Sequence, residues 1–140
     1  MYFSNKMKEF NNESIRLINL LENILNVNVK DCVVDKSNNI VYFIVETDRK
    51  IDGSLVNLIR KLTSKNVFII KYSNDLNSFL KNLIPATQFF MLVENNNKKV
   101  LKIKVNKYEK GKVIGRDKRN LILFQKILKR NFGIDEIQII

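Results

Sequence analysis

The sequence predicts an α+β protein built from two copies of one unit, in which helices cover one face of a small three-stranded sheet. Two observations lead to this fold class. The order helix, two strands, connection, helix and strand occurs twice, with a period of about 60–65 residues. The strand segments also alternate, as in KVLKIKV, where Leu101, Ile103 and Val105 are expected to face the helices and Lys102 and Lys104 the other way.

The first predicted domain, residues 1–73, starts with a helix that has a broad apolar stripe at helical spacing, formed by Ile15, Ile18, Leu21 and Leu25 together with Leu17 and Ile24. The turn-forming KSNN separates two β-branched runs and predicts a hairpin. A second helix is expected to bury Leu55, Val56, Ile59 and Leu62. In chain order the segments are a helix at 12–25, strands at 27–35 and 40–46, a helix at 54–62 and a strand at 66–72.

The second predicted domain, residues 74–140, repeats this order. Asp75 or Asn74 is expected to cap its first helix, and Gly133 to end its last one. The predicted segments are a helix at 74–84, strands at 86–94 and 98–106, a loop at 111–118, a helix at 119–132 and a strand at 136–140. The last helix is expected to bury Leu121, Phe124, Ile127 and Leu128, because their spacing forms one apolar stripe.

Positive charge is concentrated in the second half of the chain. The formal net charge is +11, of which residues 1–74 contribute +3 and residues 75–140 contribute +8. The stretch 98–130 alone holds 13 basic residues against two acidic ones, Glu109 and Asp117. A local field of this strength favours a polyanionic partner.

Several classes of function are disfavoured by composition. The chain has no histidine and one cysteine, Cys32, which is expected to be a buried hydrophobe and leaves no set of zinc ligands. No carboxylates are paired as a general acid and base, so we expect no enzyme, no cofactor and no metal site. The absence of a secretory signal pattern, of disulfides and of a long apolar run leads us to expect a cytoplasmic protein that does not enter a membrane.

The stretch GKVIGRDKRNLILF, residues 111–124, has the glycines and basic residues of a phosphate-binding loop. A Walker loop is excluded, because three residues separate Gly111 from Gly115 and Arg116 follows. A dinucleotide fingerprint needs a third glycine and a βαβ setting, and both are missing. A nucleic-acid loop at the start of a long amphipathic helix fits the pattern.

The same stretch resembles a known family. KVIGRDKRNLILFQKILKRNFGIDEIQI is similar to the second KH domain of the archaeal form of the transcription factor NusA, and NLIPA and KDCVVDKSNNIVYFIVE also match. The resemblance covers the chain from about Asn26 to Ile140. It implies two tandem type II KH domains, single-stranded RNA as the ligand, a role in transcription elongation or termination, and RNA polymerase as a second candidate partner. We expect a monomer.

The resemblance assigns the RNA contact to the second domain, at Lys112, Gly115, Arg116, Asp117, Lys118 and Arg119. Lys118 stands where the family motif Gly-x-x-Gly has its second glycine. Its side chain either obstructs the approach of RNA to the backbone or contacts a phosphate itself. Asp117 is a candidate cap for the helix that follows.

In the first domain the matching tetrapeptide is Lys50-Ile51-Asp52-Gly53, which lacks the first glycine of the motif. From Val45 to Lys50 is 5 positions, against 10 from Val105 to Gly115. We therefore expect the first domain to be degenerate, without the motif's first helix and without RNA contact.

The alternative is a protein-interaction module that docks on RNA polymerase or the ribosome and whose RNA clamps have decayed. The aromatic side chains could stack on bases, but their strand and helix spacing favours core positions for Tyr42, Phe43, Phe68, Phe89, Phe90 and Phe124.

Overall fold

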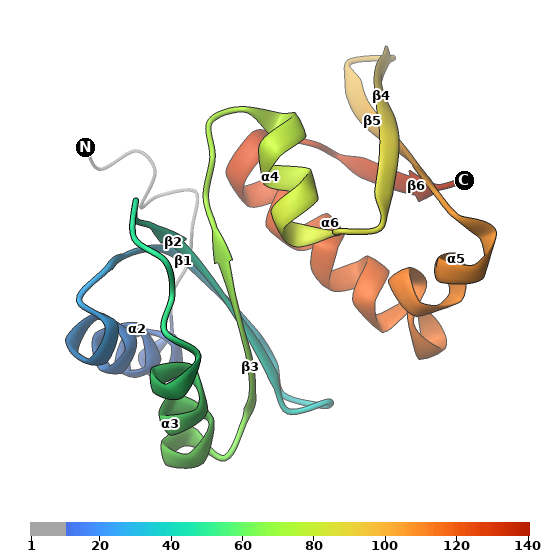
Figure 1. Cartoon of the computed structure of the whole chain (residues 1–140). Helices are drawn as coiled ribbons and strands as arrows, with labels where there is room; N and C mark the ends of the chain where they lie inside the picture. Colours follow the sequence, from blue (N-terminus) through green and yellow to red (C-terminus); the bar gives the residue numbers. More distant parts are fainter. Residues whose placement is uncertain (1–10) are drawn as a thin grey trace. The chain divides into compact units, whose positions relative to one another are not determined.

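The computed structural model describes residues 11–140, and the chain divides into two compact units between Ser73 and Asn74. The first unit contains α2 (Asn12–Leu25), β1 (Asn28–Asp35), β2 (Ile40–Glu46), α3 (Gly53–Thr63) and β3 (Asn66–Lys71) (Figure 1). The second contains α4 (Leu76–Leu83), β4 (Thr87–Asn95), β5 (Lys98–Val105), α5 (Lys107–Ile114), the 3₁₀ turn η1 (Arg116–Lys118), α6 (Arg119–Phe132) and β6 (Glu136–Ile139). Within these residues no helix combines the length and apolar character that a membrane crossing requires.

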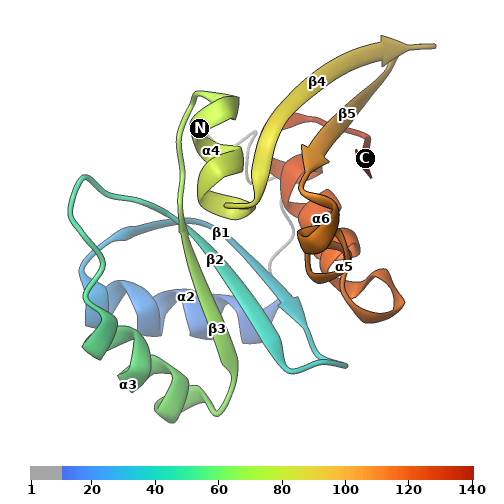
Figure 2. The ribbon, with the colours of Figure 1, turned by 45° about the vertical axis from the view of Figure 1, so that its right-hand side comes forward.

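The two sheets have the same topology. Their strand orders are β1-β2-β3 and β4-β5-β6, and in each the first pair is antiparallel and the second parallel. Each first strand also carries an irregularity near its start, between Val29 and Asp31 and between Thr87 and Phe89. Two helices of the first unit, α2 and α3, lie on the same side of its sheet (Figures 1 and 2). The predicted fold class, α+β with two tandem type II KH domains, is confirmed.

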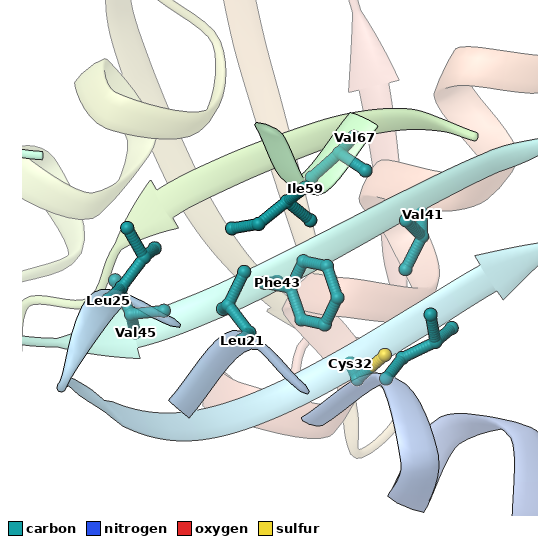
Figure 3. Packing of buried hydrophobic residues seen from close by; sticks show 9 residues of the cluster. Leu21, Leu25, Cys32, Val41, Phe43, Val45, Ile59 and Val67 are labelled. Atoms are coloured by element: carbon teal, nitrogen blue, oxygen red, sulfur yellow. The ribbon is translucent and has the colours of Figure 1, made fainter. Parts of the chain in front are cut away.

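The core of the first unit lies between its sheet and these two helices. Leu21 and Leu25 of α2 and Ile59 of α3 pack over Phe43 at the centre of β2 (Figure 3). Cys32 is buried in the same cluster, as predicted for a small hydrophobe. At about 25 cal/mol per Å², burial of such side chains stabilises the unit by roughly 1.5–3 kcal/mol each.

The core of the second unit follows the predicted alternation in β5. Leu101, Ile103 and Val105 are fully buried, whereas Lys102 and Lys104 are half-buried on the other face. Phe79 of α4 contacts Phe132 of α6, with ring centroids 5.1 Å apart. The buried stripe of α6 is Leu123, Phe124, Ile127 and Leu128, so Leu123 takes the place that we expected for Leu121.

Side-chain caps define most helix starts. Asn11 accepts a hydrogen bond from the Ser14 N–H at 2.8 Å, and Asp75 accepts one from the Ser78 N–H at 3.2 Å, which confirms Asp75 as the cap of α4. Gly133, at φ 68°, ends α6 as predicted. Left-handed backbone at this position favours glycine, because it has no Cβ.

Three apolar residues of the predicted helical stripes and strands are exposed. Ile15 is 47% exposed, Leu62 58% and Phe89 57%. In α2 and α3 the apolar stripe is broader than the surface that the sheet covers, so helical spacing alone did not identify the buried side. Phe89 lies on β4, an edge strand, and points away from the helices.

The segment before Gly115 is a helix, where we expected residues 111–118 to form a loop. Asn106 caps α5 by accepting a hydrogen bond from the Tyr108 N–H at 2.9 Å, and Val113 is its buried residue. The prediction failed because α5 has no apolar periodicity and contains Gly111, which is unfavourable in a helix interior by about 1 kcal/mol relative to alanine.

Candidate functional site at the Gly115 loop

The predicted site residues lie together at the junction of α5 and α6, in the connection and in the adjoining ends of the two helices. Lys112 is exposed near the end of α5, Gly115 ends that helix, and Arg119 is the first residue of α6. The turn η1 between them consists of Arg116, Asp117 and Lys118, all exposed. We refer to Gly115–Lys118 as the Gly115 loop.

Gly115 is required by the way in which the two helices meet. Its φ is 77° and its ψ 169°, a region that residues with a Cβ rarely occupy. A Cβ at this position would lie 2.8 Å from Nδ2 of Asn120. That Nδ2 donates a hydrogen bond to the carbonyl oxygen of Lys112 at 3.0 Å. The glycine therefore lets the start of α6 bond back to the end of α5.

Two further residues of the loop have left-handed backbone. Asp117 has φ 54° and Lys118 has φ 62°. For a residue with a side chain, this conformation costs about 1–2 kcal/mol. Lys118 thus occupies a position whose backbone suits glycine.

Two backbone amides of the loop are bonded inside the turn, and the predicted cap by Asp117 is absent. The Lys118 N–H donates to the carbonyl oxygen of Gly115 at 3.1 Å, and the Arg119 N–H donates to that of Arg116. Those two amides are therefore engaged inside the turn. Asp117 does not cap α6, because its backbone is left-handed and no side chain forms a cap hydrogen bond at this helix start.

The start of α6 is therefore positive and without a capping side chain. The first N–H groups of a helix carry partial positive charge and bind anions when no side-chain oxygen occupies them. Around this helix start stand the exposed cationic side chains of Lys112, Arg116, Lys118 and Arg119, with Asp117 as the exposed acid of the turn.

A shallow groove of about 310 Å³ lies beside the loop. Val113 of α5 and Phe124 of α6 form one wall, and the connection from α4 to β4 forms the other. The lining is mostly apolar and comprises Leu83, Ile84, Pro85, Ala86, Glu109, Lys112, Val113 and Phe124. Sequence reasoning missed this groove, although NLIPA, which supplies one wall, was among the motifs of the resemblance.

The corresponding connection in the first unit has a different structure. No helix lies between the end of β2 at Glu46 and the start of α3 at Gly53, as predicted. The Asp52 carboxylate accepts a hydrogen bond from the Ser54 N–H at 2.8 Å and caps α3. The neighbouring Arg49 is also engaged, since its guanidinium donates to the Asn26 carbonyl oxygen. The start of α3 therefore carries a negative cap where α6 has none.

Residues 11–140 contain no cluster of histidine, cysteine or acidic side chains able to hold a metal ion. The arrangement around Gly115 also lacks a nucleophile paired with a base. Its chemistry is that of anion binding beside an apolar groove.

Comparison with known proteins gives several relatives that align over most of the chain, although no protein-family model matches it. The "Probable transcription termination protein NusA" of Methanocaldococcus jannaschii is 31% identical over 134 residues, which are 91% of this chain and 73% of that one. The protein of the same name from Halococcus morrhuae is 26% identical, over 90% of this chain and 94% of its own. That from Thermoplasma acidophilum is 24% identical over 91% and 92%.

A solved structure matches both units. The crystal structure of APE1850 superposes with a TM-score of 0.76 at 30% sequence identity. The superposition covers 94% of this chain and 100% of that one. The likeness therefore extends over the whole of the repeated architecture and is not limited to the motif around Gly115.

Proposed function

The chain belongs to the NusA family of transcription termination proteins, and on this premise we propose that it binds single-stranded RNA through the Gly115 loop of its second unit. The observation that carries the proposal is the start of α6, which has no side-chain cap and stands among four basic residues. An RNA backbone phosphate is the anion that fits this place. The role is that of a non-enzymatic factor in transcription elongation or termination.

In the proposed complex a phosphate lies at the Gly115 loop. The positive end of α6 contributes roughly 0.3–1 kcal/mol at such an exposed site. Arg116, Lys118 and Arg119, backed by Lys112, contribute charge and little sequence information. The apolar groove beside the loop takes one or more bases, because Pro85 and Ala86 are the accessible apolar residues of its lining.

The first unit has a supporting role in this proposal. The Asp52 carboxylate occupies the helix start at which a phosphate would otherwise bind, and it repels phosphate. The shorter connection also leaves no counterpart of α5. The first unit is therefore a degenerate KH domain that serves as a spacer.

The Lys118 side chain is expected to hinder RNA binding rather than to support it. Its side chain stands where a glycine would leave the backbone open, and a long side chain cannot replace that access. Lys118→Gly should then tighten RNA binding. If the ammonium group instead compensates for the lost backbone access by contacting a phosphate, Lys118→Gly exchanges one contact for the other. The variant should then nearly keep its affinity and flatten the salt slope by about 0.7.

The test is filter binding of single-stranded RNA across a salt series, with wild type and a triple variant in which Arg116, Lys118 and Arg119 are glutamine. If three or four phosphates are neutralised, log affinity of wild type falls with log salt at a slope of about −2 to −3. In the triple variant the magnitude of this slope should be smaller by about 2. A Lys126→Gln variant, changed at an exposed position on α6 beyond the loop, is the control.

Two results would contradict the proposal. One is an absence of RNA binding by wild type at low salt, and the other is equal slopes for wild type and the triple variant. If native complexes crosslinked with the same protein then yield RNA polymerase subunits or ribosomal proteins without RNA, the chain is a protein-interaction module. RNA polymerase is the partner that the proposed context predicts.

A further inference from the structure

The face of the second sheet that turns away from its helices combines exposed apolar side chains with lysines. Phe89 and Met91 of β4 are 57% and 55% exposed. The register places Phe89 directly opposite Lys104 and Met91 opposite Lys102. Directly paired residues of an antiparallel ladder share one face, so these four side chains form a single surface, which we call the Phe89 face.

The Phe89 face lies on an edge of the sheet, because β4 is an edge strand. Phe89 and Lys104 pair near the end of the β4–β5 hairpin that lies opposite its turn. An aromatic ring and a thioether, each more than half exposed, stand two residues apart on one face of this strand. Apolar side chains that gather on one face are a feature of interaction sites.

The electrostatics of the Phe89 face favour an anion. Within residues 11–140 neither Lys102 nor Lys104 forms an ion pair with a carboxylate. The acid on this face, Glu136, is on the opposite edge strand, β6, and accepts a hydrogen bond from Gln138 at 3.0 Å. Lys102 and Lys104 are two residues apart on one strand, so about 6.8 Å separates their backbone positions.

This combination is not a requirement of the fold. The first sheet has the same strand order and an irregularity at the same place, so its residues can be matched by register. The positions equivalent to Phe89, Met91, Lys102 and Lys104 are Asp31, Val33, Tyr42 and Ile44. None of these four is basic. The pattern of aromatic, thioether and two lysines is therefore specific to the second unit.

We propose that the Phe89 face is a second binding surface for single-stranded RNA, on which a base stacks on the Phe89 ring and the backbone phosphates lie along Lys102 and Lys104. Aromatic rings flanked by cations hold unpaired bases in this way, and a duplex keeps its bases stacked and out of reach. The choice of RNA rests on the proposed function. The location does not, because the Phe89 face and the Gly115 loop share no residue.

A tryptophan reporter tests the surface directly. The chain has no tryptophan, so Phe89→Trp introduces a single emitter at the site. Titration with single-stranded oligouridylate should quench its emission, because the indole stacks on a base. Leu92→Trp is the matched control, since Leu92 is 45% exposed on the same strand but faces the other side of the sheet. It should show no quenching.

Affinity measurements give the second readout. Phe89→Ala should weaken RNA binding about tenfold, the loss expected for one stacked base, whereas Leu92→Ala should leave it within about twofold. The double variant Lys102→Gln with Lys104→Gln should flatten the salt slope by about 1.4. These side chains are exposed or half-buried, and circular dichroism of each variant checks that the fold is retained.

The outcomes separate this inference from the proposed function. If Arg116→Glu lowers affinity while the Phe89 and lysine variants bind as wild type and the reporter is not quenched, the inference is wrong and the proposed function stands. If the reporter is quenched and Arg116→Glu does not change the affinity for RNA, the assignment of RNA binding to the Gly115 loop is wrong. The assignment to the Phe89 face then stands. Capture of a protein and not RNA by a photocrosslinker at position 89 would also overturn the inference.

Discussion

The two units share a sheet and differ in the connection that leads to their last helix. Strand order, pairing direction and the place of the strand irregularity are the same in both. Between β5 and α6 the chain forms α5 and the Gly115 loop, whereas between β2 and α3 it forms neither. The helix start is capped by Asp52 in the first unit and has no side-chain cap in the second. The phosphate site proposed at the Gly115 loop therefore depends on the connection and does not follow from the sheet topology that the two units share.

The glycines of the two connections reinforce this difference. Gly115 has a φ that only glycine adopts easily, and Lys50 takes its place in the first unit. Gly53 begins α3 and is not among the residues with positive φ, whereas Lys118, its counterpart, has φ 62°. Each unit therefore keeps one glycine of the motif, and only the glycine of the second unit is required by its backbone.

The largest expected effect is that of Gly115→Ala. The variant combines an unfavourable φ with a Cβ that would lie 2.8 Å from Asn120 Nδ2, so it should lower the free energy of unfolding of the second unit by about 1–3 kcal/mol. Lys50→Ala, at the same motif position in the first unit, should change stability by less than about 0.5 kcal/mol. Urea unfolding followed by circular dichroism measures both.

Gly111→Ala is the control for a generic glycine effect. No atom would lie within 4 Å of the new Cβ, and Gly111 lies inside α5, so alanine should stabilise the protein by about 0.5–1 kcal/mol. If Gly115→Ala is as stable as wild type, the close contact between Gly115 and Asn120 is not a feature of the protein in solution.

A smaller effect is expected from Lys118→Gly and Gly53→Ala. Glycine relieves the left-handed strain at Lys118 but loses more entropy on folding, so the net gain should be about 0.5–1 kcal/mol. Gly53→Ala should also stabilise, by about 0.4–1 kcal/mol, because its helical position has room for a Cβ. Thermal unfolding measures the stability of both variants. If either variant were less stable than wild type, the comparison of the two motif positions would be contradicted.

The smallest expected effect concerns the loss of stability at acidic pH. In the second unit Asp135 accepts hydrogen bonds from the Lys129 ammonium and, at 2.8 Å, from the Lys99 N–H, and these bonds hold its pKa below the ordinary 3.8. In the first unit an uncharged amide, Asn39, bonds to the Ser64 carbonyl oxygen at 2.8 Å near the equivalent junction. A lowered pKa means that the carboxylate contributes stability above the ordinary value and loses it as pH falls through the folded-state pKa.

Asp135→Asn should therefore reduce the acid sensitivity of the second unit. The urea midpoints of wild type and variant should converge when the pH is lowered from about 6 to about 3. A gap between the midpoints that stays constant over this range would show that the Asp135 carboxylate is not linked to folding.

The sequence predicted the fold largely because the strands are regular. The alternation of Leu101, Ile103 and Val105 with two lysines identified the buried face of β5 without ambiguity. The buried residues of the helices were predicted less well, because a broad apolar stripe does not show which of its residues face the core. Leu62 was assigned to the core for this reason and is exposed, and Leu121 was preferred to Leu123.

At the candidate site the sequence predicted the position of the loop but not its internal geometry. Lys112 to Arg119 do lie together at the junction of α5 and α6. The helix α5 was missed, because its stability comes from the Asn106 cap and from packing of Val113 rather than from periodicity. The role of Asn120, which explains Gly115, depends on a contact between two helices that spacing alone does not show.

The comparison between the two connections is tested most directly by reversing one charge in each. Arg116→Glu and Lys50→Glu each reverse the charge of one exposed residue in the equivalent tetrapeptides of the two motifs. Single-stranded RNA is titrated into both variants and into wild type at one fixed salt concentration. Arg116→Glu should weaken binding about tenfold or more, the loss expected for a charged phosphate contact, and Lys50→Glu by less than about threefold. Equal losses in the two variants would contradict the assignment of RNA binding to the second unit.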